Sequence, residues 1–116
     1  MVAYNLYNTN EEQFVYATLS SRPYTFRFYM FRGLLYVDIT SRGENLAVGQ
    51  RVMANQWLIP NYMANHYGNV RFETYAADAD EYITPAGFNL KFRLRGYSAK
   101  EIAAMEAAAE EGAETN

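Results

Sequence analysis

The segment of residues 24–40, YTFRFYMFRGLLYVDIT, constrains the fold of this chain more than any other. It can fold back on itself about Arg32-Gly33. Because side chains alternate between the two faces of a strand, one face then receives only apolar pairs. These pairs are Phe26/Ile39, Phe28/Val37 and Met30/Leu35, whereas the other face receives Thr25/Thr40, Arg27/Asp38 and Tyr29/Tyr36. A shift by one residue would turn the apolar set outward, so the segment predicts a hairpin and its register. The turn type stays open, because Arg resists positive φ.

Shorter segments around this hairpin also have β-forming composition. Residues 14–20, 46–48, 51–53, 57–59 and 70–75 predict short strands, separated by Gly, Pro or polar turns. The last predicted strand covers residues 88–95, with Phe88, Leu90, Phe92 and Leu94 inward and Gly96 as its end. The pattern predicts an all-β domain at residues 13–97, a small antiparallel barrel or sandwich of about seven strands followed by a C-terminal helix.

The two ends of the chain differ from this β domain. Residues 1–12 are polar and Asn-rich, which predicts an arm that is disordered alone or laid against another surface. Residues 98–116 predict a helix and an acidic tail, with Ser98 and Glu101 as a capping box and Gly112 as a stop. The apolar stripe of Ile102 and Met105 is thin. We expect the helix to form when these two residues dock, and to fray beyond about Ala108.

Composition excludes several classes of site. A chain of 116 residues suits one domain, and it holds no Cys, which excludes disulfides, thiolate zinc sites and thiol nucleophiles. Its first residues lack the pattern of a signal peptide, and no apolar run approaches the roughly 20 residues of a membrane span. The absence of Cys fits the reducing cytosol or a larger assembly. The 11 Tyr suit a half-buried sheet and an interface equally.

Charge is unevenly distributed along the chain. Residues 101–116 hold five acidic residues and no basic one, out of totals of 13 and 10. The first 100 residues therefore carry ten bases against eight acids, or +2. This excess is too small to predict nucleic-acid binding from charge alone.

No motif for catalysis or metal binding stands out. His66 is the only histidine and has no partner at ligand or triad spacing. Asp78, Asp80 and Glu81 crowd one segment, but the EF-hand pattern is absent. Trp57 lies in a strand-like run, where burial explains it more simply than sugar stacking. We therefore predict no enzyme activity, no cofactor and no metal.

Lys91, Arg93 and Arg95 form a basic stripe on one face of the predicted last strand. The simplest interpretation is a solvated strand face. The second is an interface that meets acidic groups, such as the Glu-rich tail of a neighbouring copy. The third is a groove for single-stranded nucleic acid, with Tyr97 nearby for stacking. We rank the interpretations in that order.

The order of these features resembles a known family. An Arg-bearing aromatic strand (YTFRFYMF) is followed by a strand ending in aspartate (LLYVDIT) and by a Gly-containing turn (SRGEN). The segments LAVGQRVMANQWLI and GNVRFETY come next, and a final aromatic strand follows them. This pattern resembles the small baseplate plug proteins of contractile-tailed bacteriophages over residues 14–95. The chain departs from the pattern in a longer Tyr/Asn-rich segment at residues 61–69 and in its acidic helical tail.

The resemblance implies a structural virion protein at the axis of the tail, made in host cytoplasm. It implies contacts with the hub, the tube end and the spike, and several copies compatible with threefold symmetry. The alternative is a small β-barrel module that binds single-stranded nucleic acid or glycan. The hairpin's outward residues are too apolar for plain solvent, so we expect them under the helix, against the arm or against another subunit. The interface candidates are Tyr29, Phe31, Leu34, Tyr36, Tyr62, Tyr67, Lys91, Arg93, Arg95, Ile102 and Met105.

Overall fold

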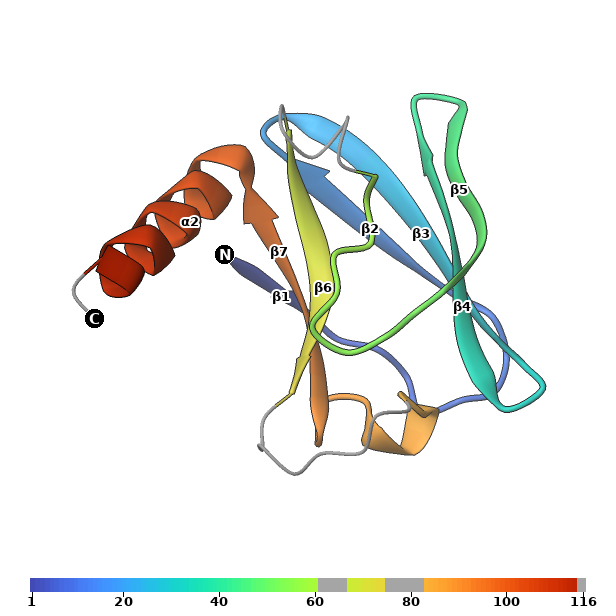
Figure 1. Cartoon of the computed structure of the whole chain (residues 1–116). Helices are drawn as coiled ribbons and strands as arrows, with labels where there is room; N and C mark the ends of the chain where they lie inside the picture. The colour runs from blue at the N-terminus through green and yellow to red at the C-terminus, as the bar shows by residue number, and fades with distance from the viewer. Residues whose placement is uncertain (61–66, 75–82, 115–116) are drawn as a thin grey trace.

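The computed structural model describes residues 1–60, 67–74 and 83–114. These residues form seven β-strands, one short 3-10 helix and one α-helix. In chain order they are β1 (Val2–Tyr4), β2 (Gln13–Leu19), β3 (Arg22–Phe31), β4 (Leu34–Ser41), β5 (Glu44–Arg51), β6 (Gly68–Thr74), η1 (Pro85–Gly87), β7 (Phe92–Ser98) and α2 (Ala99–Glu114). The strands form two antiparallel sheets, ordered β2-β3-β4-β5 and β1-β7-β6, which do not close into a barrel (Figure 1). Of the two predicted architectures, the fold is the sandwich.

The hairpin of residues 24–40 is confirmed together with its register. Arg27 lies opposite Asp38, and Tyr29 lies opposite Tyr36. At the tip, Arg32 and Gly33 have φ angles of 52° and 78°, the positive values of a type I′ turn. The turns at residues 20–21 and 42–43 have positive φ at both positions as well. Every hairpin of the β2–β5 sheet therefore has a tight turn that matches the right-handed twist of its strands.

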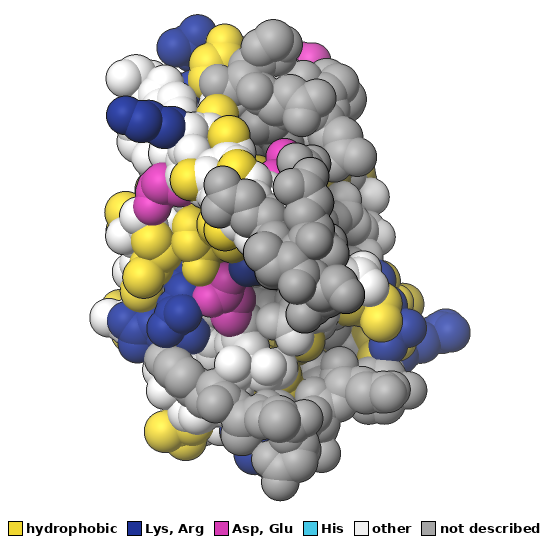
Figure 2. Space-filling view, turned by 60° about the vertical axis from the view of Figure 1, so that its left-hand side comes forward, with side chains coloured by type: hydrophobic (Ala, Val, Ile, Leu, Met, Phe, Trp, Pro, Cys, Tyr) yellow, Lys and Arg dark blue, Asp and Glu magenta, His cyan; other side chains and the backbone are white. Residues whose placement is uncertain are grey.

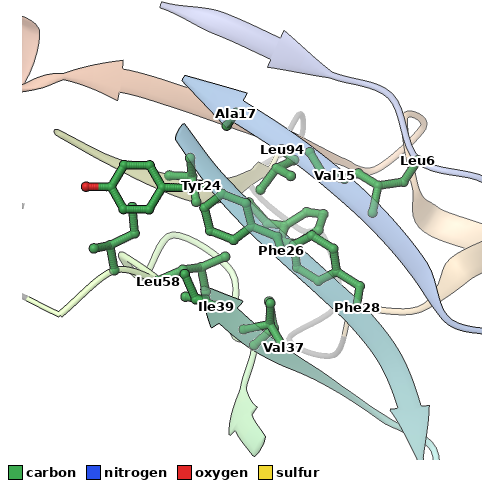
Figure 3. Packing of buried hydrophobic residues seen from close by; sticks show 14 of the residues in the cluster. Leu6, Val15, Ala17, Tyr24, Phe26, Phe28, Val37, Ile39, Leu58 and Leu94 are labelled. Carbon is green, nitrogen blue, oxygen red and sulfur yellow. The ribbon is translucent and has the colours of Figure 1, made fainter. Parts of the chain in front are cut away.

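The hydrophobic core lies between the inner faces of the two sheets. Tyr24, Phe26 and Phe28 form a row along β3 (Figure 3). Phe28 meets Phe72 of β6 edge to face, with ring centroids 5.5 Å apart, so this row joins the two sheets. Burial of a large apolar side chain contributes about 1.5–3 kcal/mol. Other buried side chains of the cluster include Val15, Ala17, Leu19, Val37, Ile39, Val70, Phe92 and Leu94.

The segment between β5 and β6 differs from the predicted series of short strands. Gly49, which was expected to separate two strands, lies within the continuous strand β5. Residues 57–59 are not a strand of either sheet, but they lie along β6. The Leu58 N–H donates to the Val70 carbonyl at 3.0 Å. This segment therefore closes one side of the core next to β6.

The predicted strand of residues 88–95 is displaced toward the C-terminus, because β7 begins at Phe92. Its first half forms a turn after η1, in which Asn89 has a φ of 64°. Asn tolerates this left-handed conformation better than most residues do. The prediction that Leu90 points inward is wrong, since the turn leaves Leu90 75% exposed.

Gly96 lies inside β7 and does not end it, which corrects the second prediction for this strand. A Cβ at Gly96 would lie 3.0 Å from the Tyr4 ring and 3.3 Å from Leu19, so neighbouring side chains fill its place. Tyr4 belongs to β1, which pairs with β7. Leu6 of the predicted arm is buried in the core. Residues 2–4 and Leu6 therefore lie against the sandwich.

Helix α2 begins with the predicted capping box. The Glu101 N–H donates to Ser98 Oγ at 3.2 Å, and the Ser98 N–H donates to the Glu101 carboxylate at 3.1 Å. The helix continues past Gly112, where a stop was predicted. It packs beside β6 and β7 with Ile102 and Met105 half-buried, and its far end points away from both sheets (Figure 1).

Candidate interaction surface

A shallow apolar groove lies on the outer face of the β2–β5 sheet. Tyr29, Phe31, Tyr36 and Gly49 line it. The Tyr29 and Tyr36 rings stack across β3 and β4 with centroids 6.0 Å apart, and Phe31 meets Tyr36 edge-on at 6.3 Å. Phe31 is 55% exposed. The groove therefore has a continuous aromatic wall that water reaches, which is typical of protein interfaces.

Asp38 holds the backbone around this groove in place. Its Oδ1 accepts the Gly49 N–H at 2.7 Å and the Tyr29 hydroxyl at 3.2 Å. Its Oδ2 accepts a hydrogen bond from Arg27 at 2.8 Å. Gly49 has a φ of 63°, which side-chain-bearing residues rarely adopt, and the register between β4 and β5 shifts on this stretch. The carboxylate and the glycine together stabilise the irregular stretch of β5.

Asp38 is ionised at neutral pH. Partial burial would by itself raise the pKa of Asp38, but hydrogen bonds from Gly49, Arg27 and Tyr29 outweigh burial and lower this pKa below its ordinary value. The Arg27 guanidinium also bonds Glu12 at 2.6 Å and lies 4.6 Å from the Tyr29 ring centroid. The predicted cross-strand pair of Arg27 and Asp38 is thus the centre of a larger charged network beside the groove.

A second aromatic pair lies on edge strand β2. The Phe14 and Tyr16 rings stack with centroids 6.5 Å apart, and they are 48% and 72% exposed. They alternate with the buried Val15 and Ala17, which places them on the outer face of the sheet. They were not among the predicted interface residues. The alternation within residues 14–20 is the sequence signal that indicates them.

Arg93 and Arg95 share one face of β7, but Lys91 of the predicted basic stripe lies outside the strand. Lys91 lies in the turn before β7. Arg95 forms an ion pair with Glu73 at 2.9 Å, and Arg71 forms another with it at 2.7 Å. Arg93 lies opposite Glu73 in the β6–β7 ladder. On the face in Figure 2, the described Lys and Arg side chains lie scattered among hydrophobic and acidic ones. This arrangement of charges does not indicate a phosphate-binding groove.

Arg71 lies between two aromatic rings on the outer face of the β1–β7–β6 sheet. Its guanidinium carbon is 4.3 Å from the Trp57 ring centroid and 5.6 Å from that of Tyr97. The Tyr97 hydroxyl donates to Glu73 at 2.7 Å. Burial would raise the pKa of Glu73, but hydrogen bonds from Tyr97, Arg71 and Arg95 outweigh it and lower this pKa. Trp57 is half-buried in this cluster, so its contacts within the chain explain its presence without a sugar.

The remaining candidates lie in different parts of the sandwich. Leu34 is half-buried opposite Phe31, and the Tyr67 ring lies 5.0 Å from the Arg22 guanidinium. Neither α2 nor β1 belongs to the groove's sheet, because α2 packs beside β6 and β7 and β1 pairs with β7. Glu12 of the predicted arm bonds Arg27 beside the groove, so contact with the arm or with another subunit stays the prediction for the groove residues. Outside the described residues lie Tyr62, His66, Asp78, Asp80 and Glu81.

Comparison with known protein families decides the class of the protein. Residues 1–97 match the family described as cyanophage baseplate Pam3 plug gp18. The chain belongs to this family of phage baseplate plug proteins. The matched region of the plug protein contains every strand as far as Tyr97 and ends before α2. A search of the curated proteins gives no match.

The family confirms the resemblance seen in the sequence. It implies that the plug protein associates with other baseplate or tail proteins and lies in the virion tail. Within its described residues, no group of three or more His, Cys, Asp or Glu side chains is placed to hold a metal ion. Its helix in the described region is too short and too polar to cross a membrane.

Proposed function

We propose that this plug protein is a structural component at the axis of a contractile phage tail, and that it acts by protein–protein assembly. Its neighbours would be the hub, the tube end and the spike, and several copies would surround the axis. The observation that carries the proposal is the family match, which covers the β-sandwich as one unit. The proposal assigns the contacts with these neighbours to the interface candidates that lie in the β-sandwich.

The outer face of the β2–β5 sheet is the surface best suited to such contacts. It presents Phe14 and Tyr16 at one edge and the aromatic groove beside β4. Aromatic anchors contribute much of the energy of protein interfaces. Tight turns and a paired ladder hold them in place, which lowers the entropy lost on binding. The face therefore presents exposed aromatic side chains next to a charged network of Arg27, Asp38 and Glu12.

Co-expression with the neighbouring tail proteins tests the proposal. The unmodified plug protein should capture at least one hub, tube-end or spike protein. Double substitution Phe14→Ser/Tyr16→Ser should reduce capture about tenfold, if this edge is part of the contact. Tyr7→Ser is the matched control, because Tyr7 is 78% exposed but precedes β2. If the unmodified protein captures no tail protein, the assembly role is wrong.

A further inference from the structure

Helix α2 is the part of the plug protein that the family match does not cover. The match ends at residue 97 and the helix begins at Ala99. From residue 101 onward the chain holds five Glu and no basic residue. Figure 1 shows the far end of the helix leaving both sheets. Among the described side chains of the helix, Glu106 is exposed, next to the exposed Ala107, Ala108 and Ala109.

Two further basic residues lie near the groove on the β2–β5 sheet, outside the network in which Arg27 pairs with Asp38 and Glu12. Arg32, in the turn beside the groove, is exposed, and its guanidinium carbon lies 5.2 Å from the Phe31 ring centroid. Within the described residues, no carboxylate forms an ion pair with Arg32. Arg51 is exposed as well and lies opposite Tyr36 in the β4–β5 ladder. An acidic partner with small apolar side chains fits this combination of aromatic wall and basic rim.

The acidic helix cannot reach this groove within one chain. It starts at the end of β7 and packs beside β6 and β7, whereas the groove belongs to the other sheet. A helix of 16 residues is only about 24 Å long at 1.5 Å per residue. Its direction is away from the sandwich (Figure 1). The helix and the groove are therefore complementary surfaces that only different copies can bring together.

We propose that α2 of one plug protein docks in the groove of Tyr29, Phe31 and Tyr36 on a second copy. The exposed Ala107, Ala108 and Ala109 lie against the rings, where their small side chains allow close approach. Glu106, which is exposed as well, meets Arg32. Pairing of α2 with α2 is disfavoured, because it would bring two acidic segments together.

This contact joins two different surfaces of the same molecule, so it is head-to-tail. Such contacts generate a closed ring when the rotation between copies closes, and an open chain when it does not. The proposal concerns self-association alone and does not depend on the axial position or on which tail proteins bind.

Charge exchange in the full-length protein tests the contact. The unmodified protein should associate with itself in sedimentation velocity runs at rising concentration, and added salt should weaken the association. Arg32→Glu and Glu106→Arg should each weaken the self-association constant about tenfold. The double variant restores opposite charges in exchanged positions, and it should recover to within about threefold of the unmodified protein.

Arg42→Glu is the matched control, because Arg42 occupies the same first position of a positive-φ turn but lies one hairpin later. It should leave self-association unchanged. The proposal is wrong if the unmodified protein stays monomeric at all concentrations, if Arg42→Glu weakens association as much as Arg32→Glu, or if the double variant fails to recover. Capture of tail proteins is a separate readout, so failure here leaves the proposed function standing.

Discussion

The side-chain amide of Asn69 gives Ile59 both hydrogen bonds that a neighbouring strand would give. Asn69 Oδ1 accepts the Ile59 N–H at 2.7 Å, and Nδ2 donates to the Ile59 carbonyl at 2.9 Å. Both residues are buried, with 1% and 2% of their surface exposed. Ile59 is therefore attached to β6 through the Asn69 side chain, next to the backbone hydrogen bond between Leu58 and Val70.

Removal of the Asn69 amide should lower the free energy of unfolding by more than the loss of an ordinary hydrogen bond does. Asn69→Ala leaves the buried Ile59 N–H and carbonyl without partners, and we expect the free energy of unfolding to fall by about 2–4 kcal/mol. Urea denaturation measures it. Asn45→Ala, at an exposed position of β5, is the control and should change stability by less than about 0.5 kcal/mol. A similar loss in both variants would contradict the role given to Asn69.

The glycines at positions 33 and 68 should respond differently to the same substitution. Both have positive φ, at 78° and 124°. A Cβ at Gly33 meets nothing within 4 Å, whereas one at Gly68 would lie 2.1 Å from the Tyr97 carbonyl oxygen. Gly33→Ala should cost about 1–2 kcal/mol from backbone strain alone. Gly68→Ala should cost more than about 4 kcal/mol, because the clash is with backbone. Thermal unfolding of the two variants tests the order, and equal losses would refute it.

The lowered pKa values of two carboxylates predict how the stability of the protein depends on pH. The fold lowers the pKa values of Asp38 and Glu73 below their ordinary values of 3.8 and 4.5. Their stabilisation is therefore complete above those values and is lost as the pH falls through the lower, folded values. At neutral pH the unmodified protein should have a larger free energy of unfolding than the double variant Asp38→Asn/Glu73→Gln. This excess should shrink below about pH 4.

Urea titrations across this pH range measure that excess. Glu11→Gln, at an exposed position before β2, serves as the control. An excess that grows as the pH falls would show that the sign is wrong.

The capping box at the start of α2 should control how firmly the helix forms. Ser98→Ala removes the side-chain acceptor for the Glu101 N–H, and the helix should lose about 1 kcal/mol. Hydrogen exchange of the α2 amides should become about fivefold faster, while the amides of β3 and β4 keep their rates. Ser98→Asp keeps an acceptor at this position and should restore slow exchange. If Ser98→Ala leaves the α2 rates unchanged, packing and not the cap stabilises the helix.

Local pattern was sufficient where a segment had one buried face and one wetter face. The hairpin of residues 24–40, its register and the capping box at Ser98 followed from alternation and spacing, and the structure confirms them. Pattern failed at residues 88–91. Phe88 and Leu90 alternate as strand residues do, but a left-handed Asn89 turns the chain there. The alternation of apolar and polar residues along a strand does not show the backbone conformation of a single residue such as Asn89.

The sequence alone determined the β class of this protein, the pairing of its central hairpin and its likeness to phage baseplate plug proteins. These depend on side-chain alternation and residue order, which are local properties. Only the tertiary structure decided that the sheets form an open sandwich, that Glu73 pairs with Arg71 and Arg95, and that Asp38 binds Gly49 beside an aromatic groove. Those contacts join residues from different strands. Which residues make these contacts depends on how the sheets pack and twist, and a local stretch of sequence does not determine this.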